Sequence, residues 1–175
     1  KIVKKTVSAL FSVCAASCIM SCASIKNAAV DSASTALSGA DRKGNPLKKN
    51  PSDADPMLAL TGETDVTLVG DFFPTALVMY EIMLRSNPEH LGLAAMTGSL
   101  NVMYANAFVQ IPADDLPNQE FDRQHDEYER AKLHYLRGRD YCLAALEGRH
   151  KGFRAAVLGS DDAAVKTAVA MLDRK

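Results

Sequence analysis

The residue best placed for covalent chemistry is Cys22, because the residues around it form an export signal. Three lysines lie within the first five residues, an uncharged run follows over residues 6–20, and small residues flank the thiol on both sides. A basic start, an apolar run and a small-residue cleavage site are typical of a secretory signal peptide. A cysteine at the cleavage point is typical of bacterial lipoproteins, in which the thiol receives a diacylglycerol. The sequence therefore predicts a lipoprotein signal peptide over residues 1–21 and lipidation of Cys22.

Two other interpretations of this segment are weaker. Cleavage before Cys18 is an alternative, but Ile19 is a better large apolar residue three positions upstream of a cleaved cysteine than Ala15 is. A membrane-spanning helix needs about 20 strongly apolar residues, whereas this run is short and diluted by serine, cysteine and alanine. We expect the mature protein to be exported and held at a membrane by lipid.

The other nucleophiles and metal ligands form no recognisable catalytic pattern. Once the signal is removed and Cys22 is acylated, Cys142 is the thiol that remains, and it is most simply a small buried apolar residue. The carboxylates of residues 120–140 alternate with Arg and Lys, which is typical of a solvated helix face rather than of a glycosidase carboxylate pair. Four histidines lack the spacing of a zinc signature: His90, His125, His134 and His150. We predict no catalytic residue, no metal site and no cofactor.

Composition narrows the fold and excludes one class of partner. The chain has 175 residues, no tryptophan and 6% aromatic residues. The alternation of β-branched residues that marks strands is nowhere sustained, so the sequence predicts an all-α fold. The 20 basic residues do not exceed the 21 acidic ones, and signal removal takes three lysines away. A nucleic-acid-binding protein would carry a basic patch instead, so we expect no nucleic-acid partner.

Residues 22–64 are predicted to form a lipidated tether that contains one short helix. Residues 26–40 are rich in alanine, and Gly39 is expected to end the helix. The apolar residues predicted to share one face of this helix are Ile25, Ala29, Ala33 and Leu37. Residues 41–56 are rich in turn formers, and we expect them to be extended and mobile.

From Asp65 the sequence becomes periodic, and we predict a helical domain over residues 65–175. The first helix should reach about Ser86, with a break or kink near Gly70 and Pro74. Residues spaced to share its apolar face are Val69, Phe73, Ala76, Leu77, Tyr80, Met83 and Leu84.

A second helix is predicted from Asn87, which fits an N-cap followed by proline at the first helical position, to about Val109. Gly98 permits close approach of a partner helix. Residues predicted to line one side of this helix are Leu91, Ala95, Gly98, Val102, Ala105 and Phe108.

Residues 111–117 read as a loop, and a long charged helix should follow and stop at Gly148. Its predicted apolar stripe consists of Phe121, Tyr128, Ala131, Tyr135, Cys142 and Leu146. A last helix is expected to start at residues 160–162 and to run to the end of the chain.

A short motif occurs twice in this domain. Ala76-x3-Tyr80-x2-Met83 recurs as Ala131-x3-Tyr135-x2-Gly138, and Pro88 follows the first copy. This small–aromatic–small spacing before a proline matches the second helix of a tetratricopeptide (TPR) repeat. The same spacing is common on any packed helix, so the motif alone does not decide between a repeat and an ordinary helical bundle.

A longer set of residues strengthens the TPR interpretation. It consists of Leu68-Val69-Gly70-Asp71-Phe72-Phe73-Pro74-Thr75-Ala76-Leu77-Val78-Met79-Tyr80-Glu81, then Leu84, Asn87-Pro88, Gly92-Leu93, Gly98 and Tyr104-Ala105-x-Ala107-Phe108-Val109. In this order the residues resemble the T component (TatT family) of tripartite ATP-independent periplasmic (TRAP) transporters. The resemblance spans roughly residues 25–158. It implies a TPR-like α-helical lipoprotein of the periplasm.

The resemblance also implies a function without catalysis. The protein would associate with the soluble substrate-binding (P) component of a TRAP transporter and help to deliver a small organic or hydrophobic ligand to the permease. It would form a homo-oligomer, with a trimer as one form, around an apolar channel or groove. The chain stops after about two helix pairs, where the family continues, which indicates a fragment or a shortened relative. The alternative function is an envelope-assembly scaffold with no small-molecule role.

Five aromatic residues are the candidates for the walls of a ligand groove, because apolar pockets are lined by such side chains. They are Phe72, Phe73, Tyr80, Tyr104 and Phe108. Their simplest role is in the core.

Overall fold

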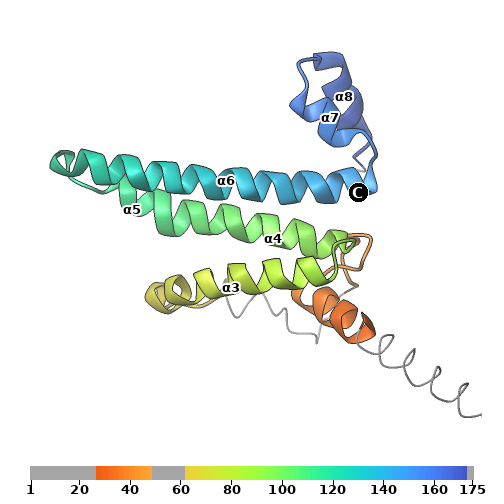
Figure 1. Cartoon of the computed structure of the whole chain (residues 1–175), viewed down its shortest axis with the longest axis horizontal. Helices are drawn as coiled ribbons and strands as arrows, with labels where there is room; N and C mark the ends of the chain where they lie inside the picture. Colours follow the sequence, from red (N-terminus) through yellow and green to blue (C-terminus); the bar gives the residue numbers. More distant parts are fainter. Residues whose placement is uncertain (1–26, 49–61, 173–175) are drawn as a thin grey trace, which may run out of the picture.

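The computed structural model describes residues 27–48 and 62–172 (Figure 1). Cys22 and the predicted signal peptide lie outside the described residues, as do residues 49–61 of the predicted tether. Within the described ranges every regular element is a helix, apart from one isolated bridge. The prediction of an all-α fold is confirmed, whereas the TPR-like repeat stays a prediction.

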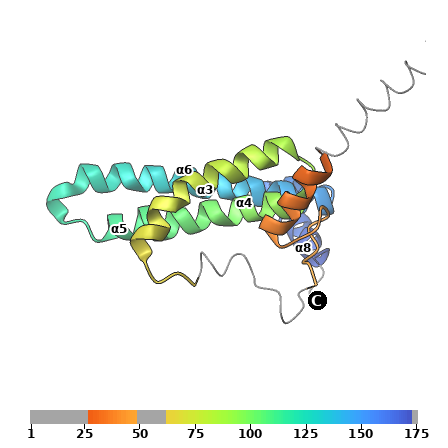
Figure 2. The ribbon, with the colours of Figure 1, turned by 90° about the horizontal axis from the view of Figure 1, so that it is seen from below.

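Three long helices form a layer, with α4 between α3 and α6 (Figure 1). Helix α3 spans Val66–Ser86, α4 spans Leu91–Tyr104 and α6 spans Phe121–Arg149. Figure 2 shows the same layer from below, with helix 27–38 beside the end of α3.

Shorter elements connect and extend this layer. The π-helical turn η1 (Ala105–Gln110) and helix α5 (Ile111–Asp114) prolong α4, and the 3-10 turn η2 (Asn118–Glu120) leads into α6. Helices α7 (Phe153–Leu158) and α8 (Asp162–Ala170) pack together at the end of α6 (Figure 1).

The main core lies on both sides of α4. Helix α3 buries Phe73, Ala76, Leu77, Tyr80 and Leu84, which confirms the face predicted from its periodicity. The most completely buried large apolar residues of α4 are Leu93 and Leu100, both at most 1% exposed. A second, smaller core holds α7 and α8 against α6 around Leu143, Phe153 and Ala168.

Helices α4 and α6 cross with their backbones in contact at two glycines. A Cβ atom on Gly98 would lie 2.7 Å from the carbonyl oxygen of Gly138 and 2.5 Å from the Sγ atom of Cys142. A Cβ atom on Gly138 would in turn lie 2.8 Å from the carbonyl oxygen of Gly98. The structure therefore identifies α6 as the partner that the small residue in α4 predicted.

We expected an extended segment beyond Gly39, but residues 41–48 form a turn that packs against the domain. The Asp41 carboxylate accepts hydrogen bonds from the backbone N–H groups of Lys43 (2.9 Å) and Asn45 (2.8 Å), which closes a tight turn. The Arg42 carbonyl then accepts the N–H of Leu91 at 2.9 Å, so the turn is joined to the start of α4. Asp41 thus closes the turn from within, and the Arg42 carbonyl joins it to the domain.

Helix 27–38 ends at Gly39 as predicted, with φ at +63°, but it buries a different face from the predicted one. Ala29 and Ala33 are exposed, whereas Ser34 and Ser38 are buried. The Tyr80 hydroxyl donates to the Leu37 carbonyl at 2.8 Å, which helps to set this orientation.

The start of α4 was predicted three residues too early. Asn87 ends α3, because its backbone N–H donates to the carbonyls of Met83 and Leu84. The N-cap of α4 is His90, whose Nδ1 accepts the N–H of Leu93 at 3.0 Å. The Nε2 atom of the same ring lies 3.0 Å from the Thr35 hydroxyl. Since Nδ1 accepts, Nε2 carries the proton and donates to Thr35, and His90 joins helix 27–38 to α4.

Four further boundaries differ from the sequence predictions. Helix α3 runs unbroken through Pro74, residues 111–114 are helical rather than a loop, and α7 was not predicted. Helix α6 continues past Gly148, which lies against the side chain of Leu91. The first residue of its predicted stripe, Phe121, is 67% exposed, because α6 is longer than the α4 helix that it packs on.

The close contact at the two glycines predicts that replacing Gly98 by alanine destabilises the protein, although alanine usually stabilises a helix. Gly98→Ala should lower the free energy of unfolding by about 1–3 kcal/mol, because the backbone oxygen of Gly138 cannot move away cheaply. An unhindered helical Gly→Ala change would instead add about 0.5–1 kcal/mol. Urea unfolding followed by circular dichroism measures the difference. The exposed neighbour Ser99→Ala is the control and should change stability little; a stabilised Gly98→Ala protein would contradict the contact.

The histidine cap predicts that stability falls on mild acidification. Burial lowers the pKa of His90 from its usual value near 6.5, against the opposing effect of the Asp31 and Asp41 carboxylates and with a smaller lowering by Arg42. The unfolded chain therefore takes up a proton near pH 6.5 while the folded protein does not. The free energy of unfolding should be highest at neutral pH and fall as the pH drops below about 6.5.

The variant His90→Asn keeps a capping acceptor that does not titrate, so its stability should depend less on pH between about 5 and 7. Part of the dependence should remain, because burial also lowers the pKa of His134. His125→Gln changes an exposed histidine and serves as the control. Equal pH slopes for wild type and His90→Asn would refute the assignment.

Candidate functional site

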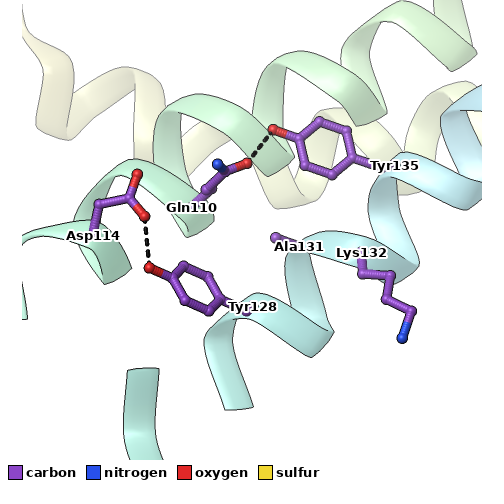
Figure 3. Close-up of a pocket in the computed structure, with 6 residues that line it drawn as sticks. All are labelled: Gln110, Asp114, Tyr128, Ala131, Lys132 and Tyr135. Atoms are coloured by element: carbon purple, nitrogen blue, oxygen red, sulfur yellow. Dashed lines mark hydrogen bonds between the residues drawn. The ribbon is translucent and has the colours of Figure 1, made fainter. Parts of the chain in front are cut away.

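An open pocket of about 370 Å³ lies where η1 and α5 meet the first half of α6 (Figure 3). We call it the seam pocket. Its lining residues are Gln110, Asp114, Tyr128, Ala131, Lys132 and Tyr135. The volume falls in the range of about 300–1,000 Å³ that is usual for small-molecule sites.

The π-helical turn positions two of these residues. Pro112 follows η1, and a proline ring clashes with the carbonyl four residues earlier in a regular α-helix. Widening the preceding turn to π geometry relieves this clash and lets the chain continue as a helix. Gln110 and Asp114 then face α6 from consecutive turns (Figure 3).

Both tyrosine hydroxyls at the pocket already donate a hydrogen bond to another side chain of the protein. The Tyr128 hydroxyl donates to Asp114 Oδ1 at 2.8 Å, and the Tyr135 hydroxyl donates to Gln110 Oε1 at 2.7 Å (Figure 3). The hydrogen bond to Asp114 raises the pKa of Tyr128 above its usual value. The hydroxyls thus fasten α6 to η1 and α5 and are poorly suited to act as proton donors or nucleophiles.

The surfaces left for a ligand are apolar faces and a few rim groups. Ala131, 2% exposed, forms the floor between the two phenol rings. At the rim the Lys132 ammonium pairs with Glu129 at 2.9 Å. This arrangement can bind a small organic molecule, and its geometry offers no nucleophile with an adjacent base.

Polar side chains join α4 to α6 beside the pocket. The amide nitrogen of Asn101 donates to the Thr97 carbonyl at 2.9 Å, so its oxygen is free to accept from His134 Nδ1 at 3.0 Å. Arg130 donates to the Tyr104 hydroxyl at 2.6 Å and lies over the same ring. These bonds join α4 and α6 on the pocket side of the glycine crossing.

The five aromatic groove candidates do not all come together. Phe73, Tyr104 and Phe108 form one cluster, with ring centroids 5.4–6.1 Å apart. Tyr80 packs separately against helix 27–38, and Phe72 is 50% exposed on the outer side of α3. None of the five lines the seam pocket, and their role as groove walls stays a prediction.

Three of the six residues that line the seam pocket lie on a helix face that the sequence predicted. Tyr128, Ala131 and Tyr135 belong to the predicted stripe of α6. The sequence did not predict Gln110 and Asp114 as site residues, since residues 111–117 are predicted to be a loop. The available signal was Pro112, a proline near the end of an apolar helix.

A second pocket and the titratable groups add no catalytic candidate. The pocket, of about 230 Å³, lies between helix 27–38 and the α3–α4 connection, with Asp31, Arg42 and Asn87 among its mainly polar lining. Across residues 27–48 and 62–172, no group of three or more His, Cys, Asp or Glu side chains could hold a metal ion.

Comparison with known proteins agrees with the resemblance noted in the sequence. A family model described as TRAP transporter T-component matches residues 62–175. An uncharacterized protein of Treponema pallidum (strain Nichols) is 42% identical over 149 residues, which cover 84% of this chain and 45% of that protein. The chain thus spans less than half the length of that relative. Because the family model covers the whole helical layer, the chain belongs to the T-component family of TRAP transporters.

Proposed function

We propose that the protein is a lipid-anchored periplasmic accessory subunit that binds the substrate-binding (P) component of a TRAP transporter. In this role it assists the uptake of a small organic or hydrophobic ligand. The observation that carries the proposal is the family match over residues 62–175, which includes every helix from α3 to α8. T components are transporter parts rather than enzymes, in line with a pocket that suits binding.

The anchor in this proposal is a diacylglycerol on Cys22. Residues 23–26 alone separate Cys22 from helix 27–38, which packs against α3 and α4. Five residue steps can span at most roughly 17 Å when fully extended. The domain would therefore lie close to the membrane surface, and the tether would be much shorter than the predicted residues 22–64. A position near the membrane suits a protein that passes ligand to a permease.

The ligand contact in this proposal is the seam pocket. Two phenol rings and the Ala131 methyl give apolar surface, while Gln110 and Lys132 supply hydrogen-bond donors at the rim. Most small-molecule sites combine an apolar lining with a few placed polar groups. The pocket opens to solvent beside α5, so a ligand can enter without separation of the helices.

The proposal predicts a complex with the P component of the same transporter. The mature protein, immobilised through its C-terminus, should retain the purified P component at tens of micromolar and should not retain the P component of an unrelated TRAP system. The absence of any retention at these concentrations would remove the main support for the accessory role and would favour the envelope scaffold.

A seam variant separates ligand binding from partner binding in the same assay. Tyr128→Ala removes a pocket wall that is 39% exposed and should retain the partner while losing small molecules that co-purify with wild type. Leu133→Ala, on an exposed part of α6, is the matched control. Mass spectrometry of the small molecules released on denaturation gives the readout.

The anchor predicts a membrane-bound protein that one substitution releases. Cys22→Ser removes the acylated thiol, so the protein should move from the membrane pellet to the soluble fraction, since two or three acyl chains give firm anchoring. Cys142→Ser keeps the signal intact and is the control. Retention of the Cys22→Ser protein in the membrane pellet would show that another segment holds it there.

A further inference from the structure

The seam pocket is bordered by two aromatic rings whose polar ends are already bonded. Tyr128 and Tyr135 are seven residues apart, so both lie on one face of α6, about 10 Å apart along its axis. Ala131 lies between them, and the two hydroxyls donate to Asp114 and Gln110 on the opposing segment (Figure 3). A group seated over Ala131 therefore meets phenol rings on two sides.

The charge of the lining is negative toward a ligand. Asp114 Oδ1 accepts the Tyr128 hydroxyl at 2.8 Å, and no Lys or Arg among the residues that the structure describes pairs with this carboxylate. Lys132 also lines the pocket, but its ammonium lies 3.1 and 2.9 Å from the two carboxylate oxygens of Glu129. This pairing offsets the charge of Lys132, so the carboxylate of Asp114 is left to act on a ligand.

Aromatic rings beside a carboxylate are the groups that recognise an organic cation. The face of an aromatic ring is negative and attracts a cation that lies within about 6 Å of the ring centroid. A cation over Ala131 is about 5 Å along the helix axis from either tyrosine, so both rings can come within this distance. The carboxylate of Asp114 adds a direct charge attraction at one end of the pocket.

We infer that the seam pocket binds a methylated ammonium group, such as that of choline, between Tyr128 and Tyr135 and beside Asp114. The inference rests on the proposed role of this pocket as the ligand contact, and it names the chemical class of the ligand. The amide nitrogen of Gln110 and the Lys132 ammonium lie at the rim, where they can donate to a hydroxyl oxygen of the same ligand.

Two other classes of charged ligand fit the pocket less well. A primary ammonium has three N–H groups that need acceptors, and burying them unpaired is costly. The Gln110 oxygen already accepts from Tyr135, which leaves Asp114 as the main acceptor. A methylated ammonium has no N–H to satisfy. An organic anion would lie near Asp114, and the cation that could oppose this repulsion, Lys132, is already paired.

Proton NMR of choline mixed with the protein tests the inference. The mature chain carrying Cys22→Ser, which removes the lipid, is added stepwise to choline at low ionic strength. The N-methyl protons should shift upfield as choline binds, because they then lie over aromatic ring faces. The uncharged isostere 3,3-dimethylbutan-1-ol should bind at least about fivefold more weakly, because a ring face attracts the positive charge and not the shape.

Substitutions at the pocket separate the ring from the hydroxyl and the charge from the shape. Tyr128→Phe keeps the ring and should bind choline within about threefold of wild type, whereas Tyr128→Leu should weaken binding about fivefold or more. Asp114→Asn keeps an acceptor for the Tyr128 hydroxyl and should weaken choline binding about threefold or more without changing that of the uncharged alcohol. Asp71→Asn, at an exposed carboxylate of α3, is the matched control and should change neither. Circular dichroism checks that each variant remains helical.

Three results would overturn the inference: no upfield shift at any accessible concentration, equal binding of choline and the uncharged alcohol, or tighter binding of succinate than of choline. Retention of the P component is measured on the same protein and separates this inference from the proposed function. A protein that retains the P component but does not bind choline would overturn the cation inference alone. A protein that binds choline without retaining the P component would support the inference and count against the accessory role.

Discussion

The contact between the backbones of Gly98 and Gly138 determines how the rest of the structure is arranged. Two helices can approach this closely only where side chains are absent. Because of this contact α4 lies in the middle of the layer, and it packs against α3 on one side and against α6 on the other. Thr97 and Asn101, both fully buried, then have to be satisfied internally. They bond to backbone carbonyls of their own helix, and Asn101 also reaches α6.

The seam pocket follows from this crossing. At the glycines α4 and α6 are in backbone contact, whereas nearer the start of α6 tyrosines fill the space between α6 and the η1–α5 segment. Tyr135 and Tyr128 bridge α6 to Gln110 and Asp114 through their hydroxyls, and their rings leave a hollow above Ala131. Because the π-turn before Pro112 sets where Gln110 and Asp114 lie, the pocket depends on a local helix distortion as well as on the crossing. In the proposed function this pocket is the ligand contact.

The sequence predicted the parts of the fold that depend on periodicity. It did not predict the helix start and the turn that single polar side chains determine. The apolar face of α3 and the close approach at Gly98 were both readable, since each reflects residue size and spacing. The cap at His90 was not readable, because an asparagine–proline pair nearby is the stronger local signal. The turn over residues 41–48 was missed for a similar reason: its composition suggests a mobile linker, but Asp41 satisfies the backbone donors. Of the pocket, the α6 tyrosines were on a predicted stripe, whereas the distorted helix that opposes them was predicted as a loop, because Pro112 suggests a helix end as readily as a widened turn.

Hydrogen–deuterium exchange, on the protein alone and with the P component of its transporter, tests the central claim most directly. The account predicts that the slowest amides of the free protein lie at the crossing, over residues 97–101 and 135–142, because these segments are released only by global unfolding. It also predicts that the P component slows exchange further on the outer surface of the domain while the crossing is unchanged. Rapid exchange at the crossing, or an exchange pattern that a saturating amount of P component leaves unaltered, would contradict the account.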